Sequence, residues 1–165
     1  MPISSSREAN PSGVVSKTAA SVRTSSLRTV RIRPWPAARS VPRWDEPKAH
    51  KHGERLRAIA RGAAKQSRRA FLPVVTDPAP IGELPEHILV LHEEEDGRLG
   101  LALPASPPDV LALIVGPEGG LTKDEIDAWR ARGARVVGLG PTVLRTETAT
   151  IVAATLTLGK YGKIG

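Results

Sequence analysis

The sequence predicts a single α/β domain with a mostly parallel sheet flanked by helices. Short apolar runs of strand length alternate with segments of helical periodicity, and glycine-rich turns follow two of those runs. Strands of a parallel sheet are covered on both faces and are therefore apolar at nearly every position. At 165 residues the chain has room for one domain of ordinary size with its own core.

Residues 1–50 differ from the rest of the chain in charge and composition. They hold nine Lys/Arg and three Asp/Glu, whereas residues 51–165 hold fifteen and fourteen, so the net charge of +7 is mostly N-terminal. The segment is rich in Ser, Arg, Pro and Ala and has no sustained strand or helix period. We expect a disordered, solvated tail. The alternatives are a tail that binds RNA phosphates and a targeting peptide.

From residue 51 onward the pattern predicts one compact unit. An amphipathic helix is expected from Glu54 to Ser67, because small and apolar residues recur at helical spacing among arginines and lysines. The apolar runs 88–91 and 110–115 are predicted to be buried strands, and residues 135–138 a further short strand.

Two more helices are predicted near the C-terminal end. Thr122 and Glu125 have the spacing of a capping box, which predicts a helix start, and Gly133 is placed to end that helix. Residues 147–158 are apolar on nearly every side, which predicts a buried helix.

Composition also narrows the class of protein. The chain has no cysteine, so it can form neither a disulfide nor a thiolate metal site. Its apolar runs are far too short to cross a bilayer. We expect a soluble, cytoplasmic protein with no metal and no membrane partner.

The two glycine-rich turns predict a ligand pocket. They are residues 115–125, VGPEGGLTKDE, and residues 138–149, GLGPTVLRTETA. In open α/β sheets ligands bind at the carboxyl ends of the strands, where both turns lie. No G-K-[ST] follows Gly116, and Gly138 and Gly140 lack the third glycine of a dinucleotide motif, so phosphate binding is disfavoured.

The same turns carry a family resemblance. GPEGGLTKDE and LGPTVLRTETA closely resemble the two signature segments of the RsmE family, the 16S ribosomal RNA uridine-N3 methyltransferases of the SPOUT superfamily. AAKQSRRAFLP and LVLHEEE resemble two further segments of that family, and the resemblance runs from about Glu54 to the end. It implies a SPOUT-type fold with a C-terminal trefoil knot, S-adenosylmethionine as cofactor, a homodimer, and 16S ribosomal RNA or the small ribosomal subunit as partner.

The resemblance also implies site residues by position. The cofactor loops would be Leu91, His92, Glu93, Gly116, Pro117, Glu118, Gly119, Gly120, Leu139, Gly140, Pro141, Leu144, Arg145, Thr146, Glu147, Thr148 and Ala149. Glu118 would orient the ligand or hold the loop, and His92 would act as a base or be a hydrogen-bonded loop residue.

Three residues are candidates for catalysis. Arg69 is the first, because Gln66-Ser67-Arg68-Arg69 matches the family segment in which an arginine faces the site; Arg68 is the alternative. Arg145 would anchor an RNA phosphate or the uracil oxygens. Glu147 would take part in catalysis or complement the dipole of the following helix.

The chain departs from the family at its N-terminal end. RsmE-like proteins begin with a small β-barrel of PUA type that helps to bind RNA, and residues 1–50 show no strand pattern for one. Either the barrel is absent or the segment is misplaced or frameshifted. The leading hypothesis is a methyltransferase, and the alternative is a catalytically silent knotted RNA-binding or ribosome-assembly protein. A plain nucleotide-binding module is disfavoured by the missing phosphate motifs.

Overall fold

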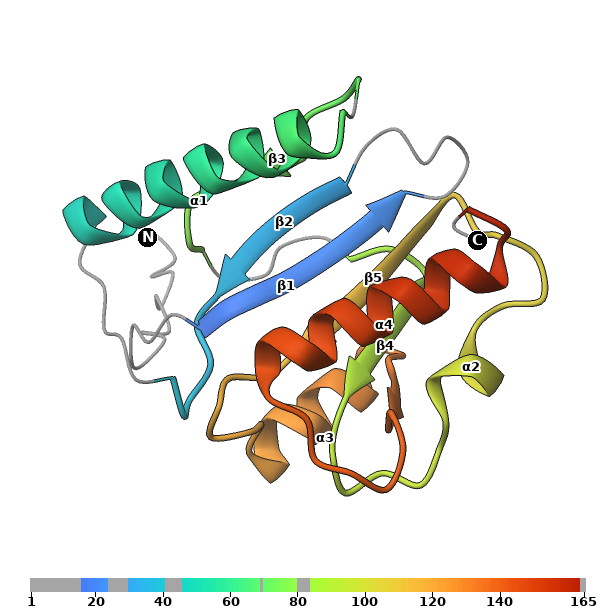
Figure 1. Ribbon diagram of the computed structural model, residues 1–165. Coiled ribbons are helices and arrows are strands. Elements are labelled where there is room, and N and C mark those ends of the chain that lie inside the picture. The colour runs from blue at the N-terminus through green and yellow to red at the C-terminus, as the bar shows by residue number, and fades with distance from the viewer. Residues whose placement is uncertain (1–15, 24–29, 41–45, 69, 80–83, 164–165) are drawn as a thin grey trace, which may run out of the picture.

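A computed structural model describes residues 16–23, 30–40, 46–68, 70–79 and 84–163 of the chain, which form one sheet with helices around it (Figure 1). The six strands lie in the order β3-β2-β1-β5-β4-β6. They are β1 (Ser16–Arg23), β2 (Val30–Trp35), β3 (Val74–Val75), β4 (His87–Leu91), β5 (Val110–Val115) and β6 (Arg135–Val137). The helices are α1 (Glu46–Gln66), α2 (Leu99–Ala102), α3 (Lys123–Ala131) and α4 (Thr146–Lys160).

The three strands predicted from the apolar runs are confirmed as β4, β5 and β6. β4 pairs in parallel with both β5 and β6, so that Leu89 lies opposite Leu113 on one side and Arg135 on the other. The carboxyl ends of all three strands therefore meet at one edge of the sheet. Two of the remaining pairings, β1 with β2 and β1 with β5, are antiparallel, and the sheet is mixed.

The prediction of disorder for residues 1–50 is wrong for the parts that the structure describes. Residues 16–23 and 30–35 are strands, and β1 lies between β2 and β5 in the middle of the sheet. The strand β1 pairs with residues some ninety positions away, for example Ala20 with Leu113 (113 − 20 = 93), and local periodicity carries no information on such pairing. Residues 1–15, 24–29 and 41–45 lie outside the described residues.

Helix α1 begins eight residues before the predicted start at Glu54 (54 − 46 = 8). Its second residue is Pro47, which the first turn of a helix tolerates because the amide there has no intrahelical partner. The helix lies along the outer edge of the sheet, where the guanidinium of Arg57 reaches Oδ1 of Asp77 at 2.7 Å. Nδ1 of His50 lies 3.1 Å from Oδ2 of the same carboxylate.

The core has two layers, one on each face of β4 and β5. One layer joins Ile88, Val90 and Ile114 to Ile126 and Trp129 of α3. The ring of Trp35 packs edge-on against that of Trp129, with centroids 5.7 Å apart. The second layer comprises Leu89, Leu91, Leu99, Ala102, Leu103, Leu111, Leu113, Val115, Val137, Ala149 and Ala153, and lies beneath α2 and α4.

The predicted start and end of α3 are confirmed. Oγ1 of Thr122 accepts from the Glu125 amide at 3.2 Å, and the Thr122 amide donates to Glu125 Oε2 at 2.9 Å, which completes a capping box. Gly133 has φ 82°, in the left-handed region that glycine adopts without strain, and it follows the last turn.

Helix α4 is confirmed, but the prediction that it is buried on nearly every side is wrong. It packs on α2 and β5 through Thr146, Ala149, Ala153 and Thr157. Ile151, on the outer face, is 66% exposed, and Leu156, at the flank of the buried face, is 46% exposed. An apolar helix can be covered all round only when a second layer lies over it, and in the described chain none does. No helix within the described segments combines the length and apolar character needed to cross a membrane.

Candidate functional site

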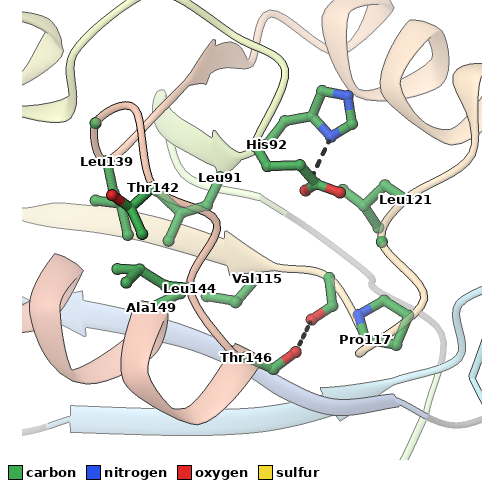
Figure 2. A pocket seen from close by; sticks show the side chains of 14 residues that line it. Leu91, His92, Val115, Pro117, Leu121, Leu139, Thr142, Leu144, Thr146 and Ala149 are labelled. Carbon is green, nitrogen blue, oxygen red and sulfur yellow. Dashed lines mark hydrogen bonds and ion pairs between the residues drawn. The ribbon is translucent and has the colours of Figure 1, made fainter.

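An open pocket lies at the carboxyl ends of β4, β5 and β6, with a volume of about 510 Å³ that includes space open to solvent. Figure 2 shows side chains entering it from the ends of these strands and from the first turns of α4. The lining residues are Leu91, His92, Glu93, Val115, Gly116, Pro117, Gly120, Leu121, Leu139, Gly140, Thr142, Leu144, Thr146 and Ala149. Parallel strands create such a crevice because all their following loops leave the sheet on one edge.

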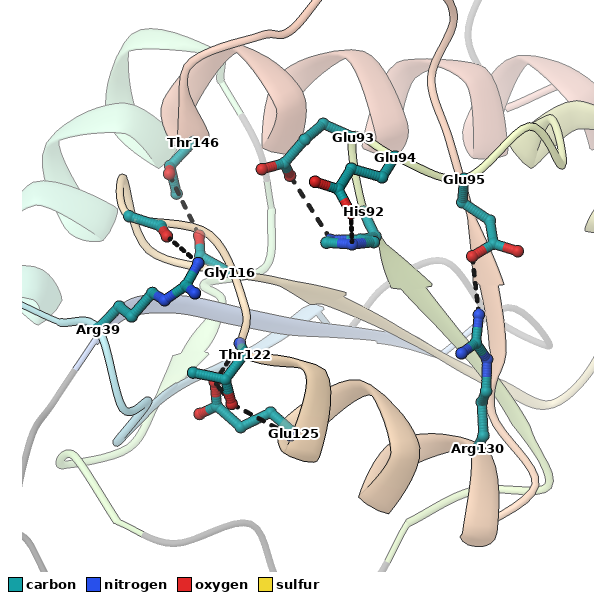
Figure 3. Close-up of polar contacts among 11 residues, drawn as sticks. Arg39, His92, Glu93, Glu94, Glu95, Gly116, Thr122, Glu125, Arg130 and Thr146 are labelled. Carbon is teal, nitrogen blue, oxygen red and sulfur yellow. Dashed lines mark hydrogen bonds and ion pairs between the residues drawn. The ribbon is translucent and has the colours of Figure 1, made fainter.

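The end of β4 contributes the polar side of the pocket. The His92 side chain is 14% exposed, and its two ring nitrogens lie 3.6 Å from the carboxylates of Glu93 and Glu94 (Figure 3). These distances are too long for hydrogen bonds, and among the described residues Nδ1 of His92 has no hydrogen-bond partner. Glu95 accepts from Arg130 of α3 at 2.8 Å and so holds the acidic turn against that helix.

The end of β5 forms a tight turn. The amide of Gly120 donates to the Pro117 carbonyl at 2.9 Å, and Gly120 has φ 71°. A Cβ atom on Gly116 would lie 2.9 Å from Cγ of Leu121, so the turn has no room for a side chain there. Oγ1 of Thr146 donates to the Gly116 carbonyl at 3.2 Å and joins this turn to the start of α4.

The third loop of the pocket follows β6 and runs back past the turn after β4. The amide of Gly138 donates to the Gly97 carbonyl at 2.6 Å, and the Leu99 amide donates to the Gly138 carbonyl at 3.0 Å. A Cβ atom on Gly138 would collide with the Glu95 carbonyl. Glycine is therefore required at this crossing because two backbone segments touch.

The structure brings most of the predicted cofactor residues together. Those that line the pocket are Leu91, His92, Glu93, Gly116, Pro117, Gly120, Leu139, Gly140, Leu144, Thr146 and Ala149. Those that do not line it are Glu118, Gly119, Pro141, Arg145, Glu147 and Thr148. Sequence reasoning missed Val115, Leu121 and Thr142, although the first two lie within or beside the first glycine-rich turn and Thr142 lies within the second.

The candidate catalytic residues are not gathered in the pocket. Arg145 is the exposed residue that caps the start of α4 through its backbone, and its side chain makes no capping hydrogen bond. Glu147 lies exposed in the first turn of α4, where an acid complements the helix dipole. Arg69 lies outside the described residues, and its neighbour Arg68, with φ 52°, is exposed beyond the end of α1.

The electrostatics of the pocket favour a neutral or cationic ligand. Among the described residues that line it there is one carboxylate, Glu93, and there is no lysine or arginine. Phosphate sites need cationic side chains or converging amides. The described residues also contain no cluster of three or more His, Asp or Glu side chains able to hold a metal ion.

Four side chains away from the pocket have shifted pKa values. The hydrogen bond from Arg57 lowers the pKa of Asp77, and the ion pair of Lys123 with Asp127 raises the pKa of the lysine and lowers that of the aspartate. Burial raises the pKa of the Tyr161 phenol, which donates to the Pro104 carbonyl at 3.1 Å.

Known proteins with similar sequences are ribosomal RNA methyltransferases. Over 129 residues the chain is 44% identical to ribosomal RNA small subunit methyltransferase E of Mycobacterium bovis, covering 72% of this chain and 49% of that protein. The Bacillus subtilis protein of the same name is 38% identical over 132 residues, covering 73% and 52%. The chain thus spans about half the length of the curated relatives that it matches.

Solved structures show the same fold. A Legionella pneumophila protein in complex with S-adenosylmethionine superposes with a TM-score of 0.71 and 32% identity, covering 77% of this chain and 54% of that one. The Neisseria gonorrhoeae ribosomal RNA small subunit methyltransferase E, bound to S-adenosylmethionine, superposes with a TM-score of 0.63 and 30% identity, covering 75% and 53%.

A family model completes the comparison. Residues 22–158 match the model of the RNA methyltransferase domain, a range that includes β2, α1 and the whole pocket. The matched range begins well before the N-terminal limit of about Glu54 suggested by the signature segments. The names of the relatives confirm the resemblance to the RsmE family. The chain therefore belongs to the RNA methyltransferase domain family.

Proposed function

We propose that the protein is an S-adenosylmethionine-dependent methyltransferase acting on N3 of a uridine in 16S ribosomal RNA. The observation that carries this proposal is the pocket, because three strand-end loops that match the RsmE signatures converge there. The superposable relatives from Legionella pneumophila and Neisseria gonorrhoeae were both solved with this cofactor bound.

The residues of the pocket fit the cofactor. Leu91, Leu139 and Leu144 supply apolar walls for an adenine ring, while the glycine turns expose backbone groups that can bond its polar edge. Glu93 offers a carboxylate to a ligand that carries positive charge. When bound, S-adenosylmethionine supplies an electrophilic methyl group on its sulfonium.

The chain itself must present the nucleotide and stabilise its charge. N3 of uracil lies on the Watson–Crick edge, so the base has to be unpaired or flipped out before it can react. Loss of the N3 proton leaves negative charge on the ring, which a guanidinium stabilises. We assign this role to Arg69, with Arg145 at the start of α4 as an anchor for the RNA and Glu147 beside it.

The crossing at Gly138 supports a trefoil knot. The amide and the carbonyl of Gly138, in the loop after β6, both form hydrogen bonds with the turn after β4. Helix α4 follows this loop and packs on β5 and α2. We propose that this C-terminal segment passes through the preceding loop. Such a knot would hold the three pocket loops together without a disulfide.

The outer face of α4 supports a homodimer. Ile151 exposes an apolar side chain opposite the buried face of the helix, and Leu156 exposes another at its flank. A second copy of the chain would cover this face and bring its own pocket close to the boundary. Ile151→Asp should then convert the dimer to a monomer in sedimentation velocity, and a wild-type protein that sediments as a monomer would contradict the assignment.

The remaining parts of the proposal concern the substrate and location. The strands in the described part of residues 1–50 belong to the methyltransferase sheet and form no separate barrel. Within the described residues, the basic side chains of α1 and Arg68 are the candidates for contact with the small ribosomal subunit. We place the protein in the cytoplasm, where ribosomal subunits are assembled.

Transfer of labelled methyl groups tests the proposed function. Purified protein, tritiated S-adenosylmethionine and small ribosomal subunits lacking the modification should yield labelled N3-methyluridine, identified by mass spectrometry of nucleosides. Arg145→Ala should reduce the transfer rate while cofactor affinity measured by calorimetry stays close to wild type. Absence of cofactor binding in the wild-type protein would contradict the proposal. Binding without transfer would favour the catalytically silent alternative.

A further inference from the structure

Arg39 contacts the glycine turn of the pocket from outside. It lies just after β2, in a segment that sequence reasoning assigned to a disordered tail, and it is not among the residues that line the pocket. Its Nη1 donates to the carbonyl of Gly119 at 3.1 Å (Figure 3). The contact joins residues eighty positions apart.

This hydrogen bond acts on a peptide group whose second residue, Gly120, lines the pocket. The peptide between Gly119 and Gly120 is held at its carbonyl by Arg39 and at its amide by the Pro117 carbonyl. Gly120 lines the pocket, and a Cβ atom there would lie 3.0 Å from Oε1 of Glu93. Rotation of this peptide would therefore change the backbone that a bound ligand meets beside Glu93.

The backbone segment that carries Arg39 is held in place by a hydrogen bond and by burial. The amide of the preceding residue, Ala38, donates to Oε1 of Glu125 at 2.8 Å, while Oε2 of the same carboxylate closes the capping box of α3. Ala37 is 2% exposed and belongs to the core layer that contains Trp129. The Arg39 side chain thus extends from a backbone segment that is already held in place. Its hydrogen bond therefore costs less conformational entropy to form.

The backbone of Arg39 also packs closely against the glycine turn at Gly119. A Cβ atom on Gly119 would lie 3.1 Å from Cβ of Arg39 and 3.3 Å from its carbonyl oxygen. These contacts are tighter than ordinary van der Waals separations, so the backbones of the two segments meet directly. A side chain on Gly119 would therefore require Arg39 to shift by a few tenths of an ångström, so the contact with Arg39 favours glycine although Gly119 does not line the pocket.

We propose that Arg39 is a positioning residue for the cofactor pocket, acting through the Gly119 carbonyl and not by contact with the ligand. The inference rests on the proposed function, because S-adenosylmethionine is the ligand whose binding it affects. A lysine at this position can donate to the same carbonyl, whereas an alanine cannot. The lysine variant thus tests whether a donor at this position is sufficient, and loss of an equivalent charge elsewhere on the chain tests for a general effect of charge.

Calorimetric titration of the full chain with S-adenosylmethionine tests the proposal. Arg39→Ala should weaken binding about 5- to 10-fold, the effect expected for one lost charged hydrogen bond at an exposed position. Arg39→Lys should restore most of that loss. Arg31→Ala, which removes the same charge from an exposed site on β2, should leave cofactor affinity unchanged. Wild-type affinity in Arg39→Ala would overturn the inference.

A second ligand distinguishes positioning from direct contact. Methylthioadenosine lacks the amino-acid end of S-adenosylmethionine, so a direct bond between Arg39 and the ligand carboxylate would be missing for it. A positioning role predicts the same relative loss in Arg39→Ala for both ligands. A loss confined to S-adenosylmethionine would overturn positioning. Failure of the wild-type protein to bind either ligand would overturn the proposed function itself, which separates the two kinds of failure.

Discussion

In the half of the sheet that carries the pocket, β4, β5 and β6 run parallel and are covered on both faces by α2, α3 and α4. In the other half, β1 and β2 are antiparallel and α1 lies at the edge, where its ion pair with Asp77 is partly exposed. We call these the pocket half and the edge half. Both core layers are centred on the pocket half, whereas polar contacts with Asp77 help to hold α1 in the edge half. Local stability should differ accordingly, because opening free energies follow buried contacts.

Removal of a core side chain from the pocket half should have the largest effect. Leu111 of β5 is completely buried, and Leu111→Ala should lower the free energy of unfolding by about 2–5 kcal/mol through lost burial and a cavity. Chemical denaturation measures this change. Leu101→Ala is the matched control, since Leu101 is 82% exposed and its truncation should cost almost nothing. Equal effects of the two substitutions would contradict the assigned core.

The second-largest loss of stability should follow removal of the hydrogen bond that joins α4 to the glycine turn. Thr146→Val keeps the shape of a buried side chain but removes the donor to the Gly116 carbonyl, at a cost of about 1–3 kcal/mol. Because Gly116 lines the pocket, cofactor affinity should fall as well. Thr155→Val, on the exposed side of the same helix, provides the control for unfolding. If both variants behave alike, the hydrogen bond does not join the two elements.

Loss of the capping box should destabilise α3 by an intermediate amount. Thr122→Ala removes the oxygen that accepts from the Glu125 amide, and the expected cost is about 1 kcal/mol. Thr122→Ser retains that oxygen and should recover most of the stability. Hydrogen exchange of the α3 amides would localise the change, and unaltered exchange in Thr122→Ala would argue against the cap.

The smallest effect is expected in the edge half. Asp77→Asn weakens the pairing with Arg57, and a partly exposed ion pair contributes at most about 1 kcal/mol. The pKa of Asp77 is lowered in the folded protein, chiefly by the hydrogen bond from Arg57. Its stabilisation is therefore present above the unfolded pKa of about 3.9 and is lost as the pH falls through the folded pKa.

Urea denaturation at two pH values checks this assignment. The difference in unfolding free energy between wild type and Asp77→Asn should be present near neutral pH. It should shrink once the carboxylate is protonated in both the folded and unfolded states. A difference that is independent of pH would mean that the aspartate contributes through packing, and the contrast between the two halves would then be weaker than proposed.

Sequence reasoning succeeded where the signal is local. The apolar run at residues 110–115 is buried on both faces, and the spacing of Thr122 and Glu125 predicted a cap that the structure contains. It failed for β1, which pairs with β5, for β2, which pairs with β1, and for the outer face of α4. The apolar character of Ile151 was correctly read, but its environment depends on what lies over the helix.

The sequence by itself determined the pocket loops, because a turn that must bend tightly or touch another backbone needs glycine, and such positions are visible as Gly116 and Gly138. Only the tertiary structure showed that Arg39 supports the first loop and that Glu125 serves both the helix cap and the Ala38 amide. Those contacts join segments about eighty positions or more apart (119 − 39 = 80; 125 − 38 = 87). They arise only when long-range strand pairing brings the segments together, and no local pattern encodes that step.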